Sequence, residues 1–332
     1  MHTRIKAIGL ISGGLDSVLA VRVVQEQSIE VIGLSCKHPF HSSSGRTSSD
    51  SAERVARQAG IELYKPDVSD TMIELVKDPP HGHGKHLNPC IDCRIMYLRE
   101  GARLMEEHGA HFLITGEVLG QRPMSQMRDT LDIVERDSGL RGLVLRPLSA
   151  RLLRPTVPEE KGWVDRERLL SISGRGRKEQ MALAEKFGIT DYDTPAGGCL
   201  LTMEGFVNKV DDLIKHKEKI SANDIELLKF GRHYRLSPKS RLAVGKHDQD
   251  NRRLMELAAA DDILILTKDV PGPAGVLRGD PSEPDLEKAL SIMASHVKRG
   301  GAVVQFQVKT ESSERTMSAS ALPAPEPAPM RL

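Results

Sequence analysis

The chain has 332 residues, with 47 Lys or Arg against 46 Asp or Glu and only four Cys, so its formal net charge is +1. This length is enough for two domains, and so few cysteines exclude a disulfide-stapled scaffold. The balanced charge requires any nucleic-acid surface to be local, and no apolar run reaches the roughly 20 residues of a membrane span. We therefore expect a cytoplasmic protein.

Strand-like apolar runs alternate with amphipathic helical runs over the first 150 residues. Strands are predicted at 5–11, 30–36, 62–68, 111–117 and 143–149, and helices at 18–27, 50–59, 91–108 and 129–137. Alternation at this spacing predicts an α/β domain with a doubly wound parallel sheet, covered by helices on both faces. We assign residues 1–202 to this domain.

A smaller α+β domain is predicted at 203–310. Ser221, with Asp224 three residues later, resembles a capping box at a helix start. Further helices are predicted at 250–259 and 285–297, and strands at 233–236, 241–244, 262–267, 274–278 and 302–308. The tail at 311–332 is rich in Ser, Ala and Pro, so we expect it to be disordered.

The first strand leads directly into the loop "SGGLDS" at 12–17. Gly13 and Gly14 let successive backbone amides surround phosphate oxygens, and the helix that follows adds its positive dipole end. Ser12 and Ser17 supply hydroxyl donors. Asp16 would repel a bare phosphate, so we expect it to hold a cation such as Mg²⁺ or to orient a neighbouring group. The loop lacks the Lys of a Walker A motif.

This stretch resembles the PP-loop of the ATP pyrophosphatases, which cleave ATP between the α and β phosphates and adenylate a substrate oxygen. Ser12, Gly13, Gly14, Asp16 and Ser17 all match that motif. The resemblance implies ATP binding at these residues and a catalytic role for Asp16. The alternative is a Gly-Gly turn before an ordinary helix.

Three cysteines are spaced in a way that indicates chemistry. Cys90 and Cys93 form a C-x-x-C pair at a predicted helix start, where the helix terminus lowers a thiol pKa, and Cys199 lies far away in sequence. Three thiolates are one short of a closed zinc site or a fully ligated [4Fe–4S] cluster, which leaves a position open. Cluster, zinc completed by an upstream histidine (His81, His83 or His86) and cysteine persulfide all stay open. Cys36 ends a strand, and we take it as a core residue.

The segment "LITGEVLGQRPMSQ" at 113–126 and the strand "VLRPL" at 144–148 resemble those of the 4-thiouridine synthases that modify tRNA. Together with the PP-loop and the cysteines, they resemble the cluster-dependent branch of tRNA-thiolating enzymes. The resemblance implies ATP contacts at Gly116 and Gln121, and catalytic and metal-binding roles for Cys90, Cys93 and Cys199. It also implies tRNA and a sulfur donor, sulfide or a desulfurase persulfide, as partners.

A usual 4-thiouridine synthase carries ferredoxin-like and THUMP regions before the PP-loop, whereas eleven residues precede Ser12 here. We therefore expect the RNA-binding module elsewhere. The C-terminal part resembles the RNA-associated domain of NFACT proteins, and its stretch 229–253 has eight basic residues against two acidic ones. We predict RNA contacts at four basic residues: Arg232, Arg235, Lys239 and Arg241. A solvated charged face is the alternative.

The leading hypothesis is an ATP-dependent tRNA sulfurtransferase that adenylates a base carbonyl oxygen and replaces it with sulfur. Arg122 and the basic stretch 141–178 are expected to hold pyrophosphate or the tRNA backbone. One alternative is sulfur insertion into, or amidation of, a small metabolite; another is a non-catalytic RNA-binding nucleotide sensor. Whether the chain forms a homodimer is open.

Overall fold

The protein is described from a computed structural model that covers residues 4–41, 48–123, 125–192, 199–297, 303–322 and 330–332. The chain divides into two compact units, Met1–Thr202 and Met203–Leu332, and each is described by itself. Among the described residues, no helix combines the length and the apolar character that crossing a membrane requires.

The first unit is built on a five-stranded sheet in the order β3-β2-β1-β4-β5, and every strand pair in it is parallel. The strands are β1 (Lys6–Leu10), β2 (Glu30–Leu34), β3 (Leu63–Tyr64), β4 (Phe112–Thr115) and β5 (Val144–Leu145). The strand order reverses between β1 and β4. In open sheets of this kind, ligands bind beyond the carboxyl ends of the strands at that reversal.

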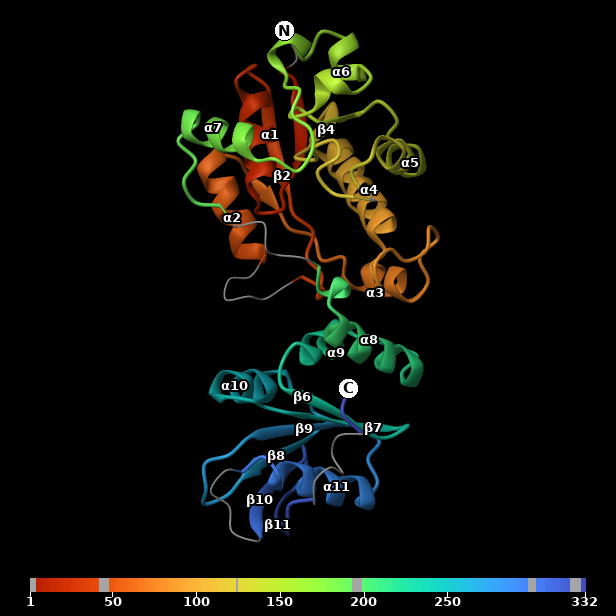
Figure 1. Cartoon of the computed structure of the whole chain (residues 1–332), viewed down its shortest axis with the longest axis vertical. Coiled ribbons are helices and arrows are strands. Elements are labelled where there is room, and N and C mark those ends of the chain that lie inside the picture. Colours follow the sequence, from red (N-terminus) through yellow and green to blue (C-terminus); the bar gives the residue numbers. More distant parts are fainter. Residues whose placement is uncertain (1–3, 42–47, 124, 193–198, 298–302, 323–329) are drawn as a thin grey trace. The chain divides into compact units, whose positions relative to one another are not determined.

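Helices cover both faces of this sheet, with α1, α2 and α7 on one side and α4 and α5 on the other (Figure 1). The helices of this unit are α1 (Leu15–Gln25), α2 (Ser48–Ala59), α3 (Ser69–Lys77), α4 (Cys90–His108), α5 (Arg128–Ser138), α6 (Val157–Glu160) and α7 (Lys178–Lys186), with single 3₁₀ turns at Ala150–Leu152, Arg166–Arg168 and Leu200–Thr202. Apolar side chains of the helices and the sheet are fully buried where the two pack together, such as Leu19 and Val24 of α1 and Phe112 of β4. The predicted doubly wound α/β fold is confirmed.

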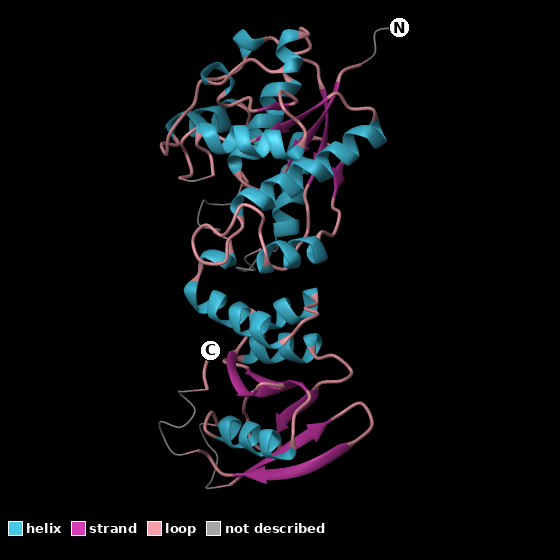
Figure 2. Cartoon of the chain, turned by 90° about the vertical axis from the view of Figure 1, so that its right-hand side faces the viewer, coloured by secondary structure: helices cyan, strands magenta, loops and turns pink. Residues whose placement is uncertain are grey.

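The second unit is a six-stranded antiparallel sheet in the order β11-β10-β8-β9-β7-β6. Its strands are β6 (Arg232–Ser237), β7 (Ser240–Val244), β8 (Ile263–Thr267), β9 (Ala274–Gly279), β10 (Val304–Lys309) and β11 (Glu314–Ala319). Its helices are α8 (Glu204–His216), α9 (Ala222–Leu228), α10 (Asp248–Leu257) and α11 (Glu283–Ala294). Figure 2 shows this separation into a helix-rich first unit and a sheet-based second one.

The two faces of the second sheet have separate cores. One face packs against α11 through Leu242, Leu290 and Phe306, and the other packs Ala243 and Val276 against α9 and α10. The predicted helix cap is present, because the Ser221 hydroxyl and the Asp224 carboxylate each accept the other's backbone N–H. The expectation of a smaller α+β domain is confirmed.

The expected disordered tail at 311–332 is wrong for the part that contains β11. This strand pairs antiparallel with β10 along its whole length, from Glu314 to Ala319. Met330 accepts a hydrogen bond from the backbone of Arg235, and Leu332 donates one to His233. A tail poor in apolar residues is ordered here because the open edges of an existing sheet supply backbone partners. Residues 323–329 lie outside the described part.

Candidate functional site

The loop after β1 is held by tight backbone packing. Gly13 has a φ of +81°, and a Cβ added there would lie 2.5 Å from the Cβ of Ser51. The Ser17 hydroxyl donates to the carbonyl of Gly14 at 2.7 Å. No side chain caps α1, so the amides of its first turn have no side-chain partner. These amides face the carboxyl edge of the sheet, where an anion would accept their hydrogen bonds.

Gly116 joins the loop after β4 to the loop after β1. A Cβ at Gly116 would lie 2.5 Å from the carbonyl carbon of Asp16 and 2.6 Å from the backbone nitrogen of Ser17. Only a residue without a side chain permits this approach. The two loops therefore form one continuous backbone surface at the β1–β4 reversal.

Asp16 connects the same two loops through its side chain. Its Oδ2 accepts a hydrogen bond from Gln121 Nε2 at 3.0 Å. Its Oδ1 is buried and has no hydrogen-bond partner among the described residues. A buried carboxylate oxygen without a partner is costly, so its chemistry fits a bound cation or a substrate donor.

A buried charge network follows Gly116, and the sequence reasoning missed it. Glu117 accepts from Arg146 Nε at 3.0 Å and pairs with Arg94 Nε at 3.2 Å, while Arg146 also pairs with Glu135. Burial by itself raises the pKa of Glu117, but Arg94 and Arg146 outweigh it and leave the pKa below its ordinary value. The network holds α4 against the loop after β4. Its contact on α4 is Arg94, the residue that follows Cys93. An Arg-Pro pair inside the strand predicted at 143–149 was the available signal.

The three predicted cysteines lie within electrostatic range of one another. Burial, with smaller contributions from the thiols of Cys199 and Cys90, raises the pKa of the Cys93 thiol to about 12. Burial likewise raises the pKa of Cys199 to about 11, with a contribution from Cys90. The expected lowering by the helix terminus is therefore wrong for Cys93, because burial has the larger effect. Residues 193–198, just before Cys199, lie outside the described part.

Two further side chains border these thiols. Tyr97 lies one helical turn after Cys93 in α4, and its hydroxyl hydrogen-bonds to Cys93 and lowers that thiol's pKa. The same hydroxyl lies 2.6 Å from Nε2 of His38. Cys36 is buried, as expected of a core residue, yet its thiol also interacts electrostatically with that of Cys93.

The upstream histidines have other partners. His81 lies between two carboxylates, 2.7 Å from Asp92 and 2.8 Å from Asp137. Its hydrogen bond to the Asp92 carboxylate is the largest cause of its raised pKa. His83 Nε2 hydrogen-bonds to the carbonyl of Val76. Within the described ranges, no three His, Cys, Asp or Glu side chains are grouped to hold a single metal ion.

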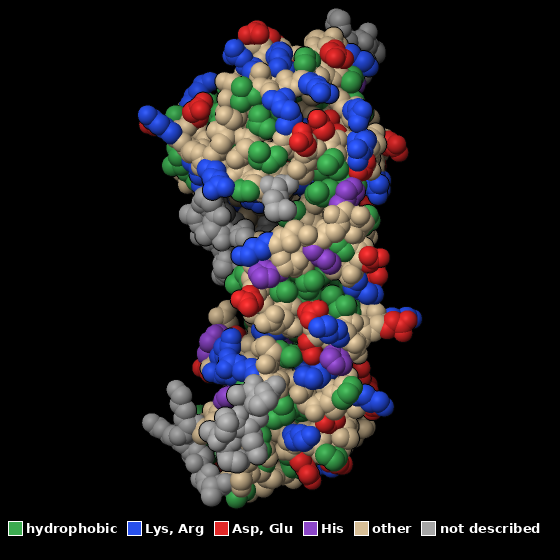
Figure 3. Space-filling view, turned by 45° about the vertical axis from the view of Figure 1, so that its right-hand side comes forward, with side chains coloured by type: hydrophobic (Ala, Val, Ile, Leu, Met, Phe, Trp, Pro, Cys, Tyr) green, Lys and Arg blue, Asp and Glu red, His purple; other side chains and the backbone are tan. Residues whose placement is uncertain are grey.

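The basic residues predicted to bind RNA differ in their surroundings. Arg235 pairs with Asp212 and is largely buried, and Arg241 is only 3% exposed. Lys239 is exposed and pairs with Asp280 at 3.3 Å, and Arg232 is half-buried. The interpretation of all four as one open basic face is therefore corrected. Alternation along β6 and β7 turns Arg235 and Arg241 toward the helices that cover that face of the sheet. On the face shown in Figure 3, basic and acidic side chains are interspersed.

Two depressions lie elsewhere on the first unit. One of about 460 Å³ is lined by Arg4, Arg22 and Glu30, at the amino ends of the strands and away from the Asp16 loop. The other, of about 200 Å³, lies beside the edge strand β5. Its lining has mixed charge, with four arginines (Arg128, Arg141, Arg146 and Arg154) and three carboxylates (Asp132, Glu135 and Glu159). Arg146 is already paired with Glu117 and Glu135.

Comparison with known proteins separates the two units. Residues 2–151 match the family model of the thiamine biosynthesis protein (ThiI). Over these residues the chain is similar to the ThiI family. Residues 231–328 match the NFACT protein RNA binding domain, which is the resemblance expected for the C-terminal part.

The chain also resembles curated tRNA-modifying proteins. It is 28% identical over 155 residues to a probable tRNA sulfurtransferase of Thermococcus kodakarensis, covering 44% of this chain and 37% of the relative. It is 33% identical over 119 residues to the tRNA-specific 2-thiouridylase MnmA of Clostridium acetobutylicum, covering 32% and 33%. The chain thus spans about a third of the length of these relatives.

Among solved structures, a 4-thiouridine synthetase–RNA complex with bound ATP aligns with a TM-score of 0.39 and 20% identity, over 68% of this chain and 52% of that one. The C-terminal part of the fibronectin/fibrinogen-binding protein from Streptococcus suis aligns with a TM-score of 0.28 and 16% identity, over 79% and 94%.

Proposed function

We propose that the protein is an ATP-dependent tRNA sulfurtransferase. A carbonyl oxygen of a tRNA base attacks the α-phosphorus of ATP, pyrophosphate leaves, and sulfur then displaces AMP from the activated carbon. The observation that carries this proposal is the continuity of three parts in one unit. The Asp16 loop touches Gly116, Glu117 binds Arg94, and Arg94 follows Cys93.

Each part has a physical task in this reaction. The amides after Gly13 and Gly14 would bind the ATP phosphates, and the Gly116 turn would complete the pocket with Gln121 orienting Asp16. The unpartnered Oδ1 of Asp16 would hold Mg²⁺, which neutralises phosphate charge when bound. Adenylation matters because an oxide is a poor leaving group and AMP is a stable one.

Cys90, Cys93 and Cys199 would hold a [4Fe–4S] cluster, which when bound offers one iron without a protein ligand to an external sulfur atom. Thiolates are soft ligands suited to iron–sulfur clusters and to zinc, and the thiols of Cys90 and Cys199 both contribute to the raised pKa of Cys93. The raised thiol pKa values mean that cluster binding must release protons. A persulfide on Cys93 or Cys199 stays the alternative sulfur carrier.

The match of the second unit to an RNA-binding domain supports tRNA as the substrate. The sulfur donor, the cytoplasmic location and a homodimer stay predictions.

Nucleoside mass spectrometry of tRNA from a strain lacking the gene tests the function. We expect one thionucleoside to disappear, to return with the wild-type gene, and to stay absent with Asp16→Asn or Cys90→Ala. Asp129→Asn is the control, since Asp129 is an exposed carboxylate in the same unit. Unchanged thionucleosides in the deletion strain would oppose the proposal and favour a small-molecule substrate or a nucleotide sensor.

Anaerobic purification with iron and zinc analysis tests the cluster separately. We expect iron and a visible absorption band in the wild type and neither in Cys199→Ala. A colourless wild-type protein with one tightly bound zinc ion would remove the cluster from the proposal.

A further inference from the structure

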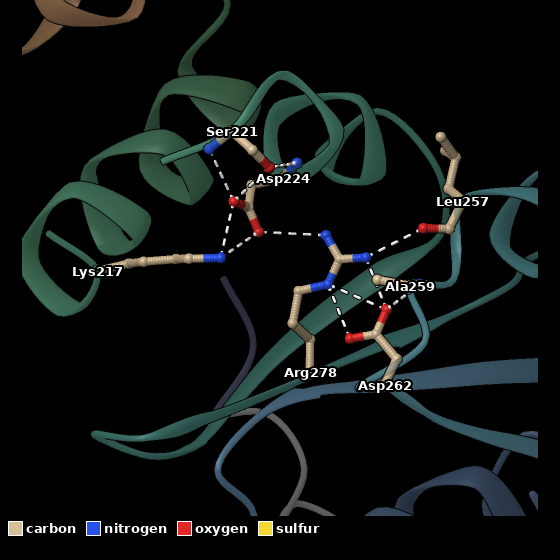
Figure 4. A network of polar contacts seen from close by, with 7 residues as sticks. All are labelled: Lys217, Ser221, Asp224, Leu257, Ala259, Asp262 and Arg278. Carbon is tan, nitrogen blue, oxygen red and sulfur yellow. Dashed lines mark hydrogen bonds and ion pairs between the residues drawn. The ribbon is translucent and has the colours of Figure 1, made fainter. Parts of the chain in front are cut away.

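Two buried arginines of the second unit have opposite surroundings. Arg278 is fully paired: it bonds Asp262 at 2.6 Å, Asp224 at 3.2 Å and the carbonyl of Leu257 at 3.0 Å (Figure 4). Burial alone lowers its pKa, but the two carboxylates outweigh this and leave the pKa raised. This is the usual condition for a buried charge, which is tolerated when it is paired and hydrogen-bonded.

Arg241 lacks such partners. It is 3% exposed, and its Nη1 is buried without a hydrogen-bond partner. Over the described residues, no ion pair reaches its guanidinium group. Burial, followed by the charges of Arg235 and Arg278, lowers the pKa of Arg241 to about 10, and the more distant Asp224 and Asp212 oppose this only in part. This pKa is still far above neutral pH. A permanent positive charge is therefore buried without a neutralising carboxylate in contact.

The β6–β7 register explains which groups surround Arg241. Arg241 lies directly opposite Arg235, and His233 lies two residues before Arg235 on the same face of the sheet. Helix α8 covers this face, because its Asp212 pairs with Arg235. Lys209 lies one turn earlier on α8 and so faces the same group.

The neighbouring groups add positive charge. Burial, followed by the charges of Lys246 and Arg241 and opposed by Asp250, lowers the pKa of Lys209 to about 8. Among the described residues, the one hydrogen-bond acceptor of Lys209 Nζ is the carbonyl of Leu228, at 2.9 Å. Asp250 Oδ2 is already used, since it accepts from the backbone nitrogens of Gly231 and Lys246.

His233 adds a second unsatisfied atom. It is fully buried, its Nε2 bonds the carbonyl of Phe230, and its Nδ1 has no hydrogen-bond partner. Burial first, and then Lys209 and Arg241, lowers its pKa well below the ordinary value, so His233 is neutral. A neutral imidazole can donate from one nitrogen only, and it does not neutralise the cations.

We propose that Lys209 and Lys246, with the buried Arg241 behind them, form a phosphate-binding site on the second unit. Lysine ammonium groups bind phosphate as point charges, and Arg241 supplies a fixed positive potential that no contacting carboxylate cancels. Lys246 is exposed and Lys209 is half-buried, so the ligand enters from solvent. The phosphate belongs either to an RNA backbone, a source that rests on the proposed function, or to a free phosphate compound.

Hydrogen exchange of the full-length protein tests the site with inorganic phosphate as the probe, against chloride at equal ionic strength. At a phosphate concentration ten times its dissociation constant, we expect exchange of the β6 and β7 amides to slow about tenfold in the wild type. Lys209→Gln should lose this response. Lys215→Gln is the matched control, because Lys215 is an exposed residue of the same helix that pairs with Asp211.

The unfolding temperature of Arg241→Met is a second test, and its expected rise cannot result from a variant that fails to fold. Without phosphate, this variant should unfold at a higher temperature than the wild type, by about 3–6 °C, because an unpaired buried charge is removed. It should no longer respond to phosphate. The site is disproved if the wild type shows no difference between phosphate and chloride, or if Lys209→Gln responds as strongly as the wild type.

An RNA duplex distinguishes the two sources of phosphate. If RNA binds here, Lys209→Gln should weaken binding and reduce the slope of log affinity against log salt by about one. An unchanged slope together with a positive phosphate response would assign the site to a free phosphate compound. Neither measurement uses sulfur transfer, so failure of this site leaves the proposed function standing, and the reverse also holds.

Discussion

Replacing Gly116 by alanine is the sharpest test of the candidate site. The added Cβ would lie 2.5 Å from the carbonyl carbon and 2.6 Å from the carbonyl oxygen of Asp16, and 2.6 Å from the backbone nitrogen of Ser17. All three are backbone atoms, so no side-chain rotation relieves the contact. The β4 turn and the Asp16 loop must separate.

The size of the movement sets the expected effect. The nearest contact must lengthen from 2.5 Å to an ordinary 3.4 Å, a displacement of about 0.9 Å. A misplacement of about 1 Å in a reacting arrangement can lower the rate about 100-fold, which corresponds to about 3 kcal/mol. Overpacking should also lower the free energy of unfolding by roughly 1–3 kcal/mol.

Three assays measure these effects. Thionucleoside formation gives the rate, calorimetry gives the ATP affinity, and denaturant unfolding of the same samples gives the stability. Gly176→Ala is the control, because a Cβ at Gly176 meets no atom within 4 Å. If Gly116→Ala binds ATP and unfolds like Gly176→Ala, the two loops are not in contact and the reasoning is refuted.

Three further predictions concern buried polar and sulfur groups. Tyr97→Phe removes the hydrogen bond that lowers the pKa of Cys93, so alkylation of this thiol in the metal-free protein at pH 9 should slow further; an equal or faster rate would contradict the contact. Cys36→Ala should lower the free energy of unfolding by about 1–2 kcal/mol through the cavity it leaves, while the iron content stays unchanged; loss of iron would make Cys36 a ligand. Lys209 has a pKa lowered to about 8 from 10.5, so the unfolded chain binds more protons between these values, and stability should rise with pH across that window by an upper limit of about 3 kcal/mol. Hydrogen exchange of the β6 and β7 amides measures this stability, and Lys209→Met should remove most of its rise with pH. An identical rise in the variant would refute the assignment.

Much of the first unit was predictable because its signals are local. Glycines 13 and 14 after an apolar run, and the period of the following helix, predict a strand, a phosphate-type loop and a helix without reference to the rest of the chain. The same holds for the Ser221 cap, whose two hydrogen bonds span three residues. Helix α8 was not predicted, although its Lys209 and Asp212 decide the environment of β6.

The tail shows the limit of composition. Residues 314–319 carry too few apolar side chains to fold alone, yet they form a strand because the edge of β10 offers unpaired backbone groups. The RNA prediction failed in part for a related reason. A count of basic residues over 229–253 does not reveal that alternation turns Arg235 and Arg241 toward α8. There Arg235 pairs with Asp212, whereas Arg241 Nη1 has no hydrogen-bond partner among the described residues.

The sequence by itself determined the parallel α/β architecture, the Asp16 loop and the Cys90–Cys93 pair at a helix start, since each depends on residues that are neighbours along the chain. Only the tertiary structure decided that Gly116 touches Asp16, that burial raises the pKa of Cys93, and that Tyr97 and Cys36 border the same thiol. These facts depend on which strands lie side by side and on how much water is excluded, and neither quantity is written in a local pattern.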